Sequence, residues 1–307
     1  MEEPKRVIPD TNWLHFDVWN STKSLLYSIQ NHFQTDLSIR GINVTEIFSV
    51  GALFSGILET QIVETLNRMR GIWDKDAKYF PYSFVRQPQN FPDVLLMRTA
   101  GGEEPKSKDI LFGIELKSWY ILSKEGEPSF RYQITPAACA DADLLVIVPW
   151  TLSDVVSGAP KLFQPWIESA RYVAEYRNFY WQESREQRNK NPNIRIPKDT
   201  KHYPGIRQEA ADEAEEDKGG NFGRIARTNI LNQYINSLKD EFFLGIKISH
   251  WIEFFRAVSD TSADIEIERR IRSIKEKVQT RGDRSEKSKM FLDIMEIIEK
   301  LWRDNLC

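Results

Sequence analysis

Three polar residues, Asp93, Glu115 and Lys117, have the types and spacing that metal-assisted hydrolysis of a phosphodiester requires. Glu115 and Lys117 are two residues apart in an otherwise apolar run, 110–117, which predicts a β-strand. Because side chains alternate between the two faces of a strand, both charged groups are expected on one face. Asp93 begins an earlier predicted strand, 91–97, and an antiparallel hairpin between the strands would place it beside Glu115.

The expected chemistry follows from two carboxylates placed side by side. They repel each other unless positive charge lies between them, and oxygen ligands without His or Cys favour a hard ion such as Mg²⁺. Such an ion would polarise a phosphate oxygen and lower the pKa of a bound water. Lys117 would orient that water and offset the charge of the transition state. Gly113, on the same face, is expected to leave room beside the charged groups.

The order Pro92-Asp93, then 21 residues, then Glu115-Leu116-Lys117 resembles the PD-(D/E)XK nuclease superfamily, and most closely its type II restriction endonucleases. The resemblance covers roughly residues 46–150, with the predicted order helix, strand, strand, helix, strand. It implies that Asp93 and Glu115 bind Mg²⁺, with the backbone carbonyl of Leu116 as a further ligand, and that Lys117 assists the attacking water. It also implies double-stranded DNA as substrate, a short specific cleavage sequence, and a homodimer with one active site per strand.

The superfamily often adds an acidic residue from the preceding helix, and Glu59 is the candidate for this catalytic role. It borders the apolar stripe of a helix predicted over 46–70. The alternative for Glu59 is an ion pair at the edge of the core, with Arg68 or Lys117 as its partner. The alternative for Glu115 and Lys117 is that they form the solvated face of an amphipathic edge strand. The upstream Pro92-Asp93 favours a nuclease instead.

The surrounding elements predict an α/β protein with a restriction-endonuclease-like mixed central β-sheet flanked by helices and a helical C-terminal part. Hydrophobic periodicity and turn residues predict these elements. They are a helix over 46–70, a loop over 72–90, antiparallel strands over 91–97 and 110–117, a helix starting at 135–138, a buried parallel strand over 144–148 and a helix over 160–182.

Three regions are expected. Residues 1–182 would form the nuclease core with an N-terminal helical region, 183–223 a polar insertion, and 224–307 a helical C-terminal region packed on the core. Within the insertion, residues 183–207 hold seven basic and three acidic residues, and 208–217 hold six acidic and no basic ones. The acidic run predicts a flexible, solvated segment.

DNA contacts are expected from basic and amide side chains, which bind phosphates and base edges. Candidates come from the segment before Asp93, from the segment after Lys117 and from the polar insertion. They are Arg86, Gln89, Lys124, Arg131, Arg195, Lys198 and Lys201. The basic residues of 269–284 alternate with glutamates, which is more typical of an ordinary solvated helix.

Composition bounds the class of protein. The chain has 307 residues, 41% hydrophobic and 28% charged, and its net charge of −3 means that a DNA surface must come from local clustering. Cys139 and Cys307 offer neither a disulfide framework nor a zinc site, and the sequence carries no signal peptide and no long apolar run. A cytoplasmic protein with no membrane partner is expected.

Two rival functions remain open at this stage. One is a repair or recombination nuclease of the same superfamily. The chain has no P-loop pattern, so no nucleotide cofactor is expected, and this favours a stand-alone restriction enzyme. The other is a catalytically silent DNA-binding protein that keeps the fold. The intact Asp93, Glu115 and Lys117 argue against it.

Overall fold

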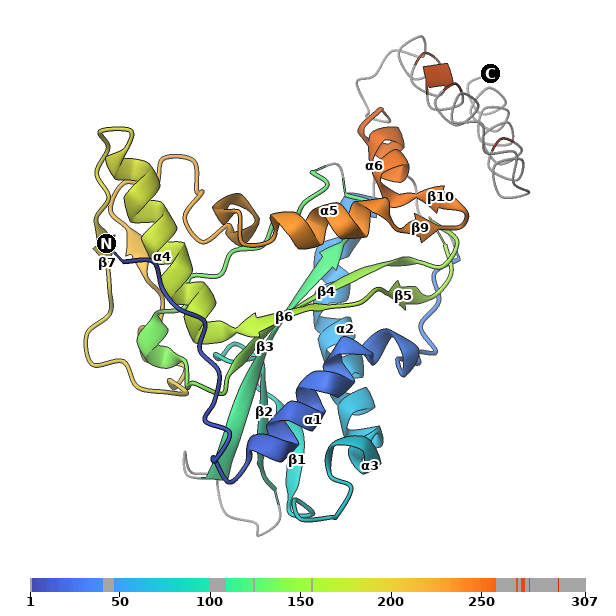
Figure 1. The fold of residues 1–307 in the computed structure, drawn as a ribbon. Helices are drawn as coiled ribbons and strands as arrows, with labels where there is room; N and C mark the ends of the chain where they lie inside the picture. Colours follow the sequence, from blue (N-terminus) through green and yellow to red (C-terminus); the bar gives the residue numbers. More distant parts are fainter. Residues whose placement is uncertain are drawn as a thin grey trace.

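The computed structural model describes residues 2–40, 47–99, 109–123, 125–155 and 157–257, and five single residues beyond 257. These residues form a mixed α/β fold around one central sheet (Figure 1). Its strands are β1 (Tyr82–Arg86), β2 (Val94–Arg98), β3 (Ile110–Tyr120), β4 (Leu144–Leu152), β5 (Pro160–Leu162) and β6 (Trp166–Ser169). They lie in the order β1-β2-β3-β4-β5, and β6 pairs with the first half of β4.

The sheet is mixed because only β3 and β4 are parallel. β1 with β2, β2 with β3, and β4 with both β5 and β6 are antiparallel. Every residue of β4 is buried, as expected for a strand covered on both faces. The predicted antiparallel pair over 91–97 and 110–117 and the predicted parallel strand over 144–148 are therefore confirmed.

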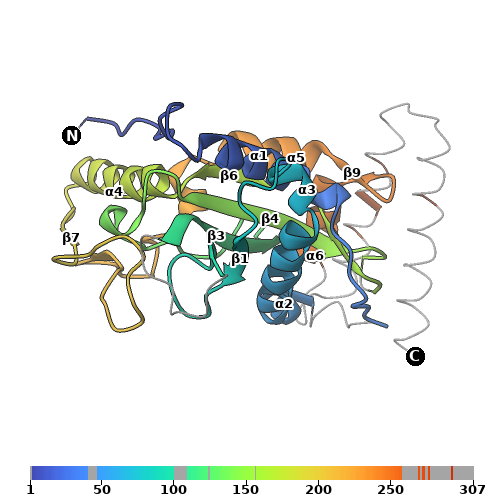
Figure 2. The ribbon, with the colours of Figure 1, turned by 90° about the horizontal axis from the view of Figure 1, so that it is seen from below.

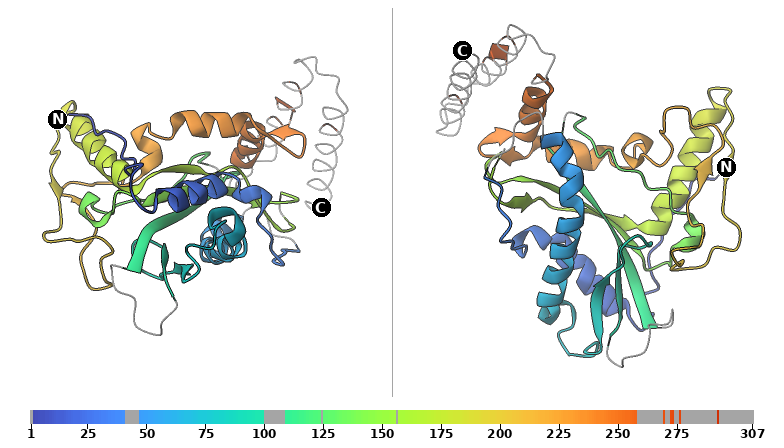
Figure 3. Two further views of the ribbon diagram at one scale, coloured as in Figure 1. Left: turned by 60° about the horizontal axis from the view of Figure 1, so that its bottom comes forward. Right: turned by 180° about the vertical axis from the view of Figure 1, so that it is seen from behind.

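Helices cover both sides of the sheet. α2 (Ile47–Arg68) contacts β1 and β3 on one side, and α1 (Phe16–Tyr27) lies on the other, next to β6 (Figures 1 and 3). The view from below also separates these two helices (Figure 2). The other helices are α3 (Arg70–Trp73), α4 (Ala170–Glu186), α5 (Asn232–Asp240) and α6 (Ile248–Ala257). No helix within the described ranges is long and apolar enough to cross a membrane.

α2 confirms the helix predicted over 46–70 and shows why that prediction held. Leu58, Ile62 and Leu66 recur every four residues and are buried against the sheet. Phe54 continues this stripe and packs against Trp150 of β4, with ring centroids 5.5 Å apart. The helix thereby fixes one face of β3, the strand that carries Glu115 and Lys117.

Three predicted elements were wrong in part. The loop predicted over 72–90 contains β1, and the helix predicted from 135–138 is only a 3-10 turn, η3 (Pro136–Ala138). After this turn the chain is extended at Cys139, and the Asp143 carboxylate accepts the N–H of Ala140 at 2.7 Å. The described residues of the β3–β4 crossover, 121–123 and 125–143, therefore contain no α-helix.

The helix predicted over 160–182 begins only at Ala170. Residues 160–169 hold β5 and β6, separated at Pro165, which cannot continue a helix. The hydroxyl of Ser169 accepts the N–H of Tyr172 at 3.3 Å and caps α4. The apolar residues before Ala170 fit strand and helix periods equally well, so their spacing alone did not decide between them.

The polar insertion 183–223 is held to the sheet and to α4 by buried polar contacts. Arg177 of α4 pairs with Asp212 at 2.5 Å, and both side chains are buried. The hydroxyl of Tyr203 donates to the buried Asp143 carboxylate at 3.1 Å. These anchors attach the insertion next to the strand that carries the predicted site.

The acidic run of the insertion is largely exposed, as its charge predicted, but it is not a free segment. Part of it forms β8 (Glu213–Ala214), which pairs with β7 (Ile194–Arg195). Arg195 lies 2.8 Å from both Glu209 and Glu213. Opposite charges face each other across β7 and β8, and their attraction favours the pairing of these two strands.

Residues 224–257, the described stretch of the C-terminal region, are helical only in part. Between α5 and α6 lies a hairpin of β9 (Phe242–Phe243) and β10 (Ile246–Lys247), and the indole of Trp251 donates to the Phe243 carbonyl at 3.0 Å. Arg269 and Arg272 are exposed, but most of the basic stretch 269–284 lies outside the described residues. The division of the chain at 182 and 223 stays a prediction.

Candidate active site

Asp93 and Glu115 meet at the start of the β2–β3 pair. Asp93 directly precedes β2, and its N–H donates to the Glu115 carboxylate at 3.2 Å. In return, the N–H of Leu116 donates to Oδ2 of Asp93 at 2.9 Å. The two carboxylates are therefore held by each other's strands, and the hairpin register that pairs Val94 with Ile114 sets their positions.

Lys117 lies against both acids. Its Nζ is 2.6 Å from Oε1 of Glu115 and 3.7 Å from Oδ2 of Asp93. The side chain of Glu115 is only 7% exposed, while those of Asp93 and Lys117 are 21% and 23% exposed. The three charged groups thus form one cluster that solvent reaches from the side of Asp93 and Lys117.

The electrostatics of the cluster are set by burial and by the paired acids. Burial first, and then the Glu115 carboxylate, raise the pKa of Asp93 to about 7, although Lys117 and the Leu116 N–H oppose this rise. Burial by itself would lower the pKa of Lys117, but Glu115 and Asp93 outweigh it and hold that pKa above its ordinary value. A single ammonium therefore does not fully offset two neighbouring carboxylates.

The donor set fits a hard divalent cation. Within the described ranges, no group of three or more His, Cys, Asp or Glu side chains is placed to hold a metal. Mg²⁺ needs fewer, because it is usually bound by one or two carboxylates and keeps several waters. Since the N–H and C=O of a strand residue point to the same side, the Leu116 carbonyl faces the side on which Asp93 lies. Asp93, Glu115 and this carbonyl would supply oxygen ligands only.

Glu59 lies near the cluster but not in it. Its carboxylate is 3.0 Å from Arg86 of β1, and the side chains are 17% and 37% exposed. The ion-pair partner is therefore Arg86, and the predicted partners Arg68 and Lys117 were wrong. Glu59 is still close enough to contribute to the raised pKa of Lys117. It extends the charged network of the site from β3 to α2.

Gly113 serves a different purpose from the one its position predicted. A Cβ placed on Gly113 would lie 2.2 Å from Cγ of Pro92 and 3.1 Å from the Asp143 carboxylate. The room beside the acids is therefore filled by Pro92, whose close approach lets Asp93 reach Glu115. The N–H of Gly113 also donates to Asp143 at 2.6 Å.

Gly113→Ala is expected to destabilise the protein by about 2 kcal/mol or more, because the added methyl group overpacks the contact with Pro92. Thermal or denaturant unfolding measures the change. Gly71→Ala is the matched control, because Gly71 lies in α3 with nothing within 4 Å of its added Cβ. The control should be neutral or more stable by about 0.5–1 kcal/mol. Equal stability of the two variants would contradict the contact.

Asp143 is a residue of this region that the sequence did not single out. Its buried carboxylate accepts hydrogen bonds from Gly113, Ala140 and Tyr203, and burial raises its pKa to about 6. It supports the backbone two residues before Glu115. One sequence signal was present, an acid directly before the apolar run 144–148, but two of its three partners are 30 and 60 residues away.

Comparisons with known protein families, curated proteins and solved structures found no match. The functional interpretation therefore depends on the chemistry of the cluster itself.

The predicted DNA-binding residues are spread over several surfaces. Gln89 is exposed at a positive φ in the loop before Asp93, and Lys198 and Lys201 are exposed in the insertion. Arg86 and Arg195 are already ion-paired, as described above. Arg131 lies against Gly220, where an added Cβ would meet its guanidinium at 1.9 Å, and Lys124 lies outside the described residues. The described members of this set therefore come from β1, β7 and several loops, and not from one element.

Proposed function

We propose that this protein is a Mg²⁺-dependent type II restriction endonuclease that hydrolyses double-stranded DNA at a short specific sequence, acting as a homodimer. The observation that carries the proposal is the contact of Asp93, Glu115 and Lys117, with the ammonium 2.6 Å and 3.7 Å from the two acids. Residues 22 and 24 positions apart in sequence meet here through a strand pair. The resemblance to PD-(D/E)XK nucleases supplies the substrate, the specificity and the dimer.

The fold supports the same proposal in part. α2, the β2–β3 hairpin and the parallel strand β4 provide the helix, two strands and third strand of a restriction-endonuclease-like core. The helix expected between β3 and β4 is replaced by the turn η3 and extended chain. The crossover still returns β4 parallel to β3, which keeps Glu115 in the interior of the sheet.

The residues can divide the work of hydrolysis among them. Asp93, Glu115 and the Leu116 carbonyl would hold Mg²⁺, which when bound polarises a phosphate oxygen and makes a water more acidic. The ammonium of Lys117 donates hydrogen bonds to the attacking water and to the phosphate oxygens as they gain negative charge. The Glu59–Arg86 pair adds a second, fixed charge pair beside Lys117.

Incubation of mapped plasmid DNA with the purified chain, with Mg²⁺ or with EDTA, tests the proposal. Discrete fragments that require Mg²⁺ are expected. A smear would favour the repair or recombination nuclease, and intact DNA at all Mg²⁺ concentrations would favour the silent DNA-binding protein. Sequencing of the fragment ends would then give the recognition sequence.

Mg²⁺ binding is expected to weaken as the pH falls below about 7, because a proton on Asp93 competes with the metal. Well below that pH, the apparent affinity should fall by up to about tenfold per pH unit. Calorimetric titration with Mg²⁺ between pH 5.5 and 8.5, without DNA, measures this. An affinity that stays constant over the range would contradict the assignment of Asp93 as a ligand.

A further inference from the structure

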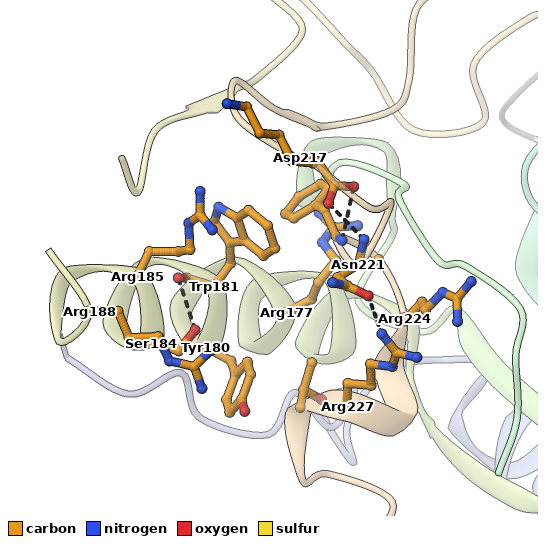
Figure 4. Close-up of a pocket in the computed structure, with 14 residues that line it drawn as sticks. Arg177, Tyr180, Trp181, Ser184, Arg185, Arg188, Asp217, Asn221, Arg224 and Arg227 are labelled. Carbon is orange, nitrogen blue, oxygen red and sulfur yellow. Dashed lines mark hydrogen bonds between the residues drawn. The ribbon is translucent and has the colours of Figure 1, made fainter. Parts of the chain in front are cut away.

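A strongly basic pocket lies between α4 and the segment 217–228. Its volume is about 310 Å³. Figure 4 shows Arg185 on α4 and Arg188 just beyond its C-terminal end, with Asn221, Arg224 and Arg227 across from them. Six cationic side chains contribute to the lining, namely Arg177, Arg185, Arg188, Lys218, Arg224 and Arg227.

The pocket has little negative charge of its own. Asp217 is the one carboxylate among its lining residues. That carboxylate accepts the backbone N–H groups of Asn221 and Phe222 at 2.7 Å and 3.1 Å and so holds the loop that forms the wall. Within a protein whose net charge is −3, this concentration of cations favours an anionic ligand.

Three of the six cations are already paired. Arg177 pairs with Asp212, Arg185 lies 3.7 Å from Glu216, and Arg227 lies 3.7 Å from Glu127. For the remaining three, Arg188, Lys218 and Arg224, the described part of the chain offers no ion-pair partner. They come from both walls of the pocket, Arg188 from the turn just after α4 and the other two from the facing segment.

Two of the three aromatic residues that line the pocket, Trp181 and Phe222, contact arginines. The guanidinium of Arg185 lies 4.9 Å from the Trp181 ring, and that of Arg177 lies 4.9 Å from the Phe222 ring. Trp181 and Phe222 also pack edge to face, with centroids 5.3 Å apart. Because these rings contact arginines and each other, they fix the cations in place. With six cations and one carboxylate in its lining, the pocket is suited to phosphate oxygens.

A single stretch of chain, 131–134, connects this pocket to the candidate active site. Arg177 donates to the carbonyls of Tyr132 and Ile134 at 2.8 Å and 3.0 Å. The Tyr132 ring in turn packs against Phe91, two residues before Asp93, with centroids 6.4 Å apart. Buried contacts therefore join the wall of the pocket to the segment that precedes Asp93.

We propose that the pocket binds phosphate groups of a nucleic-acid backbone, apart from the phosphate that is cleaved. Arg188, Lys218 and Arg224 supply the free charges, and Arg185 supplies a fixed guanidinium. The volume exceeds that of one phosphate group, and the free cations on both walls fit a chain of phosphates. DNA as the source of these phosphates rests on the proposed function, whereas the phosphate chemistry of the pocket does not.

The test is the binding of a fluorescent 30-base-pair duplex to the full chain in EDTA, where no Mg²⁺ supports cleavage, over a series of salt concentrations. The variant Arg188→Gln/Arg224→Gln is expected to weaken binding by at least about tenfold at 0.1 M salt. The slope of log affinity against log salt should become shallower by about two. The matched control, Arg40→Gln/Arg98→Gln, removes two exposed arginines that line neither site and should bind like the wild type.

A second arm measures thermal unfolding with inorganic phosphate, which is expected to stabilise the wild type more than the pocket variant. If the pocket variant and the control bind the duplex equally well, the pocket does not bind nucleic acid and the proposal is overturned. The plasmid cleavage assay tests the proposed function independently of this result. Stabilisation by phosphate without duplex binding would keep the site and reject nucleic acid as its source. Absence of both effects would overturn the proposal entirely.

Discussion

Replacing Lys117 by alanine is expected to abolish Mg²⁺-dependent cleavage while leaving DNA binding in place. The ammonium is the one donor of the cluster that can reach both the attacking water and the phosphate oxygens as their charge grows. Loss of one such preorganised donor lowers the rate of the chemical step by about 10²–10³-fold. Single-turnover cleavage measures the rate, and duplex binding in EDTA measures the affinity. Retention of the cleavage rate within about tenfold would contradict the role of Lys117.

The same substitution has a second expected effect, on the metal-free protein. Without the ammonium, the Asp93 and Glu115 carboxylates lie together in a partly buried site with nothing between them to offset their charge. The variant should therefore be less stable than the wild type at pH 8 and should gain more from added Mg²⁺. Lys247→Ala is the matched control, because Lys247 pairs with Asp240 at 2.7 Å in a more exposed site. Removal of that surface pair should cost less than about 1 kcal/mol.

The candidate site could be predicted because its geometry is local. The period of two along β3 places Glu115 and Lys117 together, and a single hairpin brings Asp93 to them. The helix α2 was likewise predicted from its periodic apolar stripe, and the buried strand β4 from a short continuous apolar run. In this molecule, contacts between residues close in sequence are therefore the ones that can be predicted most directly.

The supports of the site could not be predicted because they join distant segments. Asp143 meets Gly113 from 30 residues away and Tyr203 from 60, and no spacing rule connects them. The pairing of Glu59 with Arg86 depends on how α2 crosses β1, which periodicity does not determine. The basic pocket arises in the same way, from α4 and the segment 217–228, which begins within the insertion.

Charge patterning was misleading for a related reason. The basic and acidic halves of the insertion suggested two independent surfaces, one for DNA and one for solvent. In the structure Arg195 forms ion pairs with Glu209 and Glu213, and Arg177 forms one with Asp212. What distinguishes a cation available to a ligand is the absence of such a partner, and only the fold shows this.

The Asp93→Asn variant is expected to lose cleavage and Mg²⁺ affinity and yet to be more stable than the wild type in EDTA at pH 8. Burial and Glu115 raise the pKa of Asp93 from 3.8 to about 7 in the folded protein. The folded state therefore binds more protons than the unfolded state between these values, and wild-type stability falls as the pH rises through this window. An asparagine removes the charge and with it this loss, for a gain of about 1–2 kcal/mol at pH 8 after allowance for solvent exposure.

The pH dependence distinguishes this effect from an ordinary change in packing. The stability difference between Asp93→Asn and the wild type should vanish below about pH 4, where the aspartate is protonated in both states. Urea unfolding at pH 4, 6 and 8 measures it, and Asp76→Asn, at an exposed aspartate 3.6 Å from Lys78, should show no such trend. A variant less stable than the wild type at pH 8 would mean that attraction to Lys117 outweighs both burial and repulsion by Glu115. That result would contradict the raised pKa of Asp93, and with it the inference that Asp93 and Glu115 need a further cation.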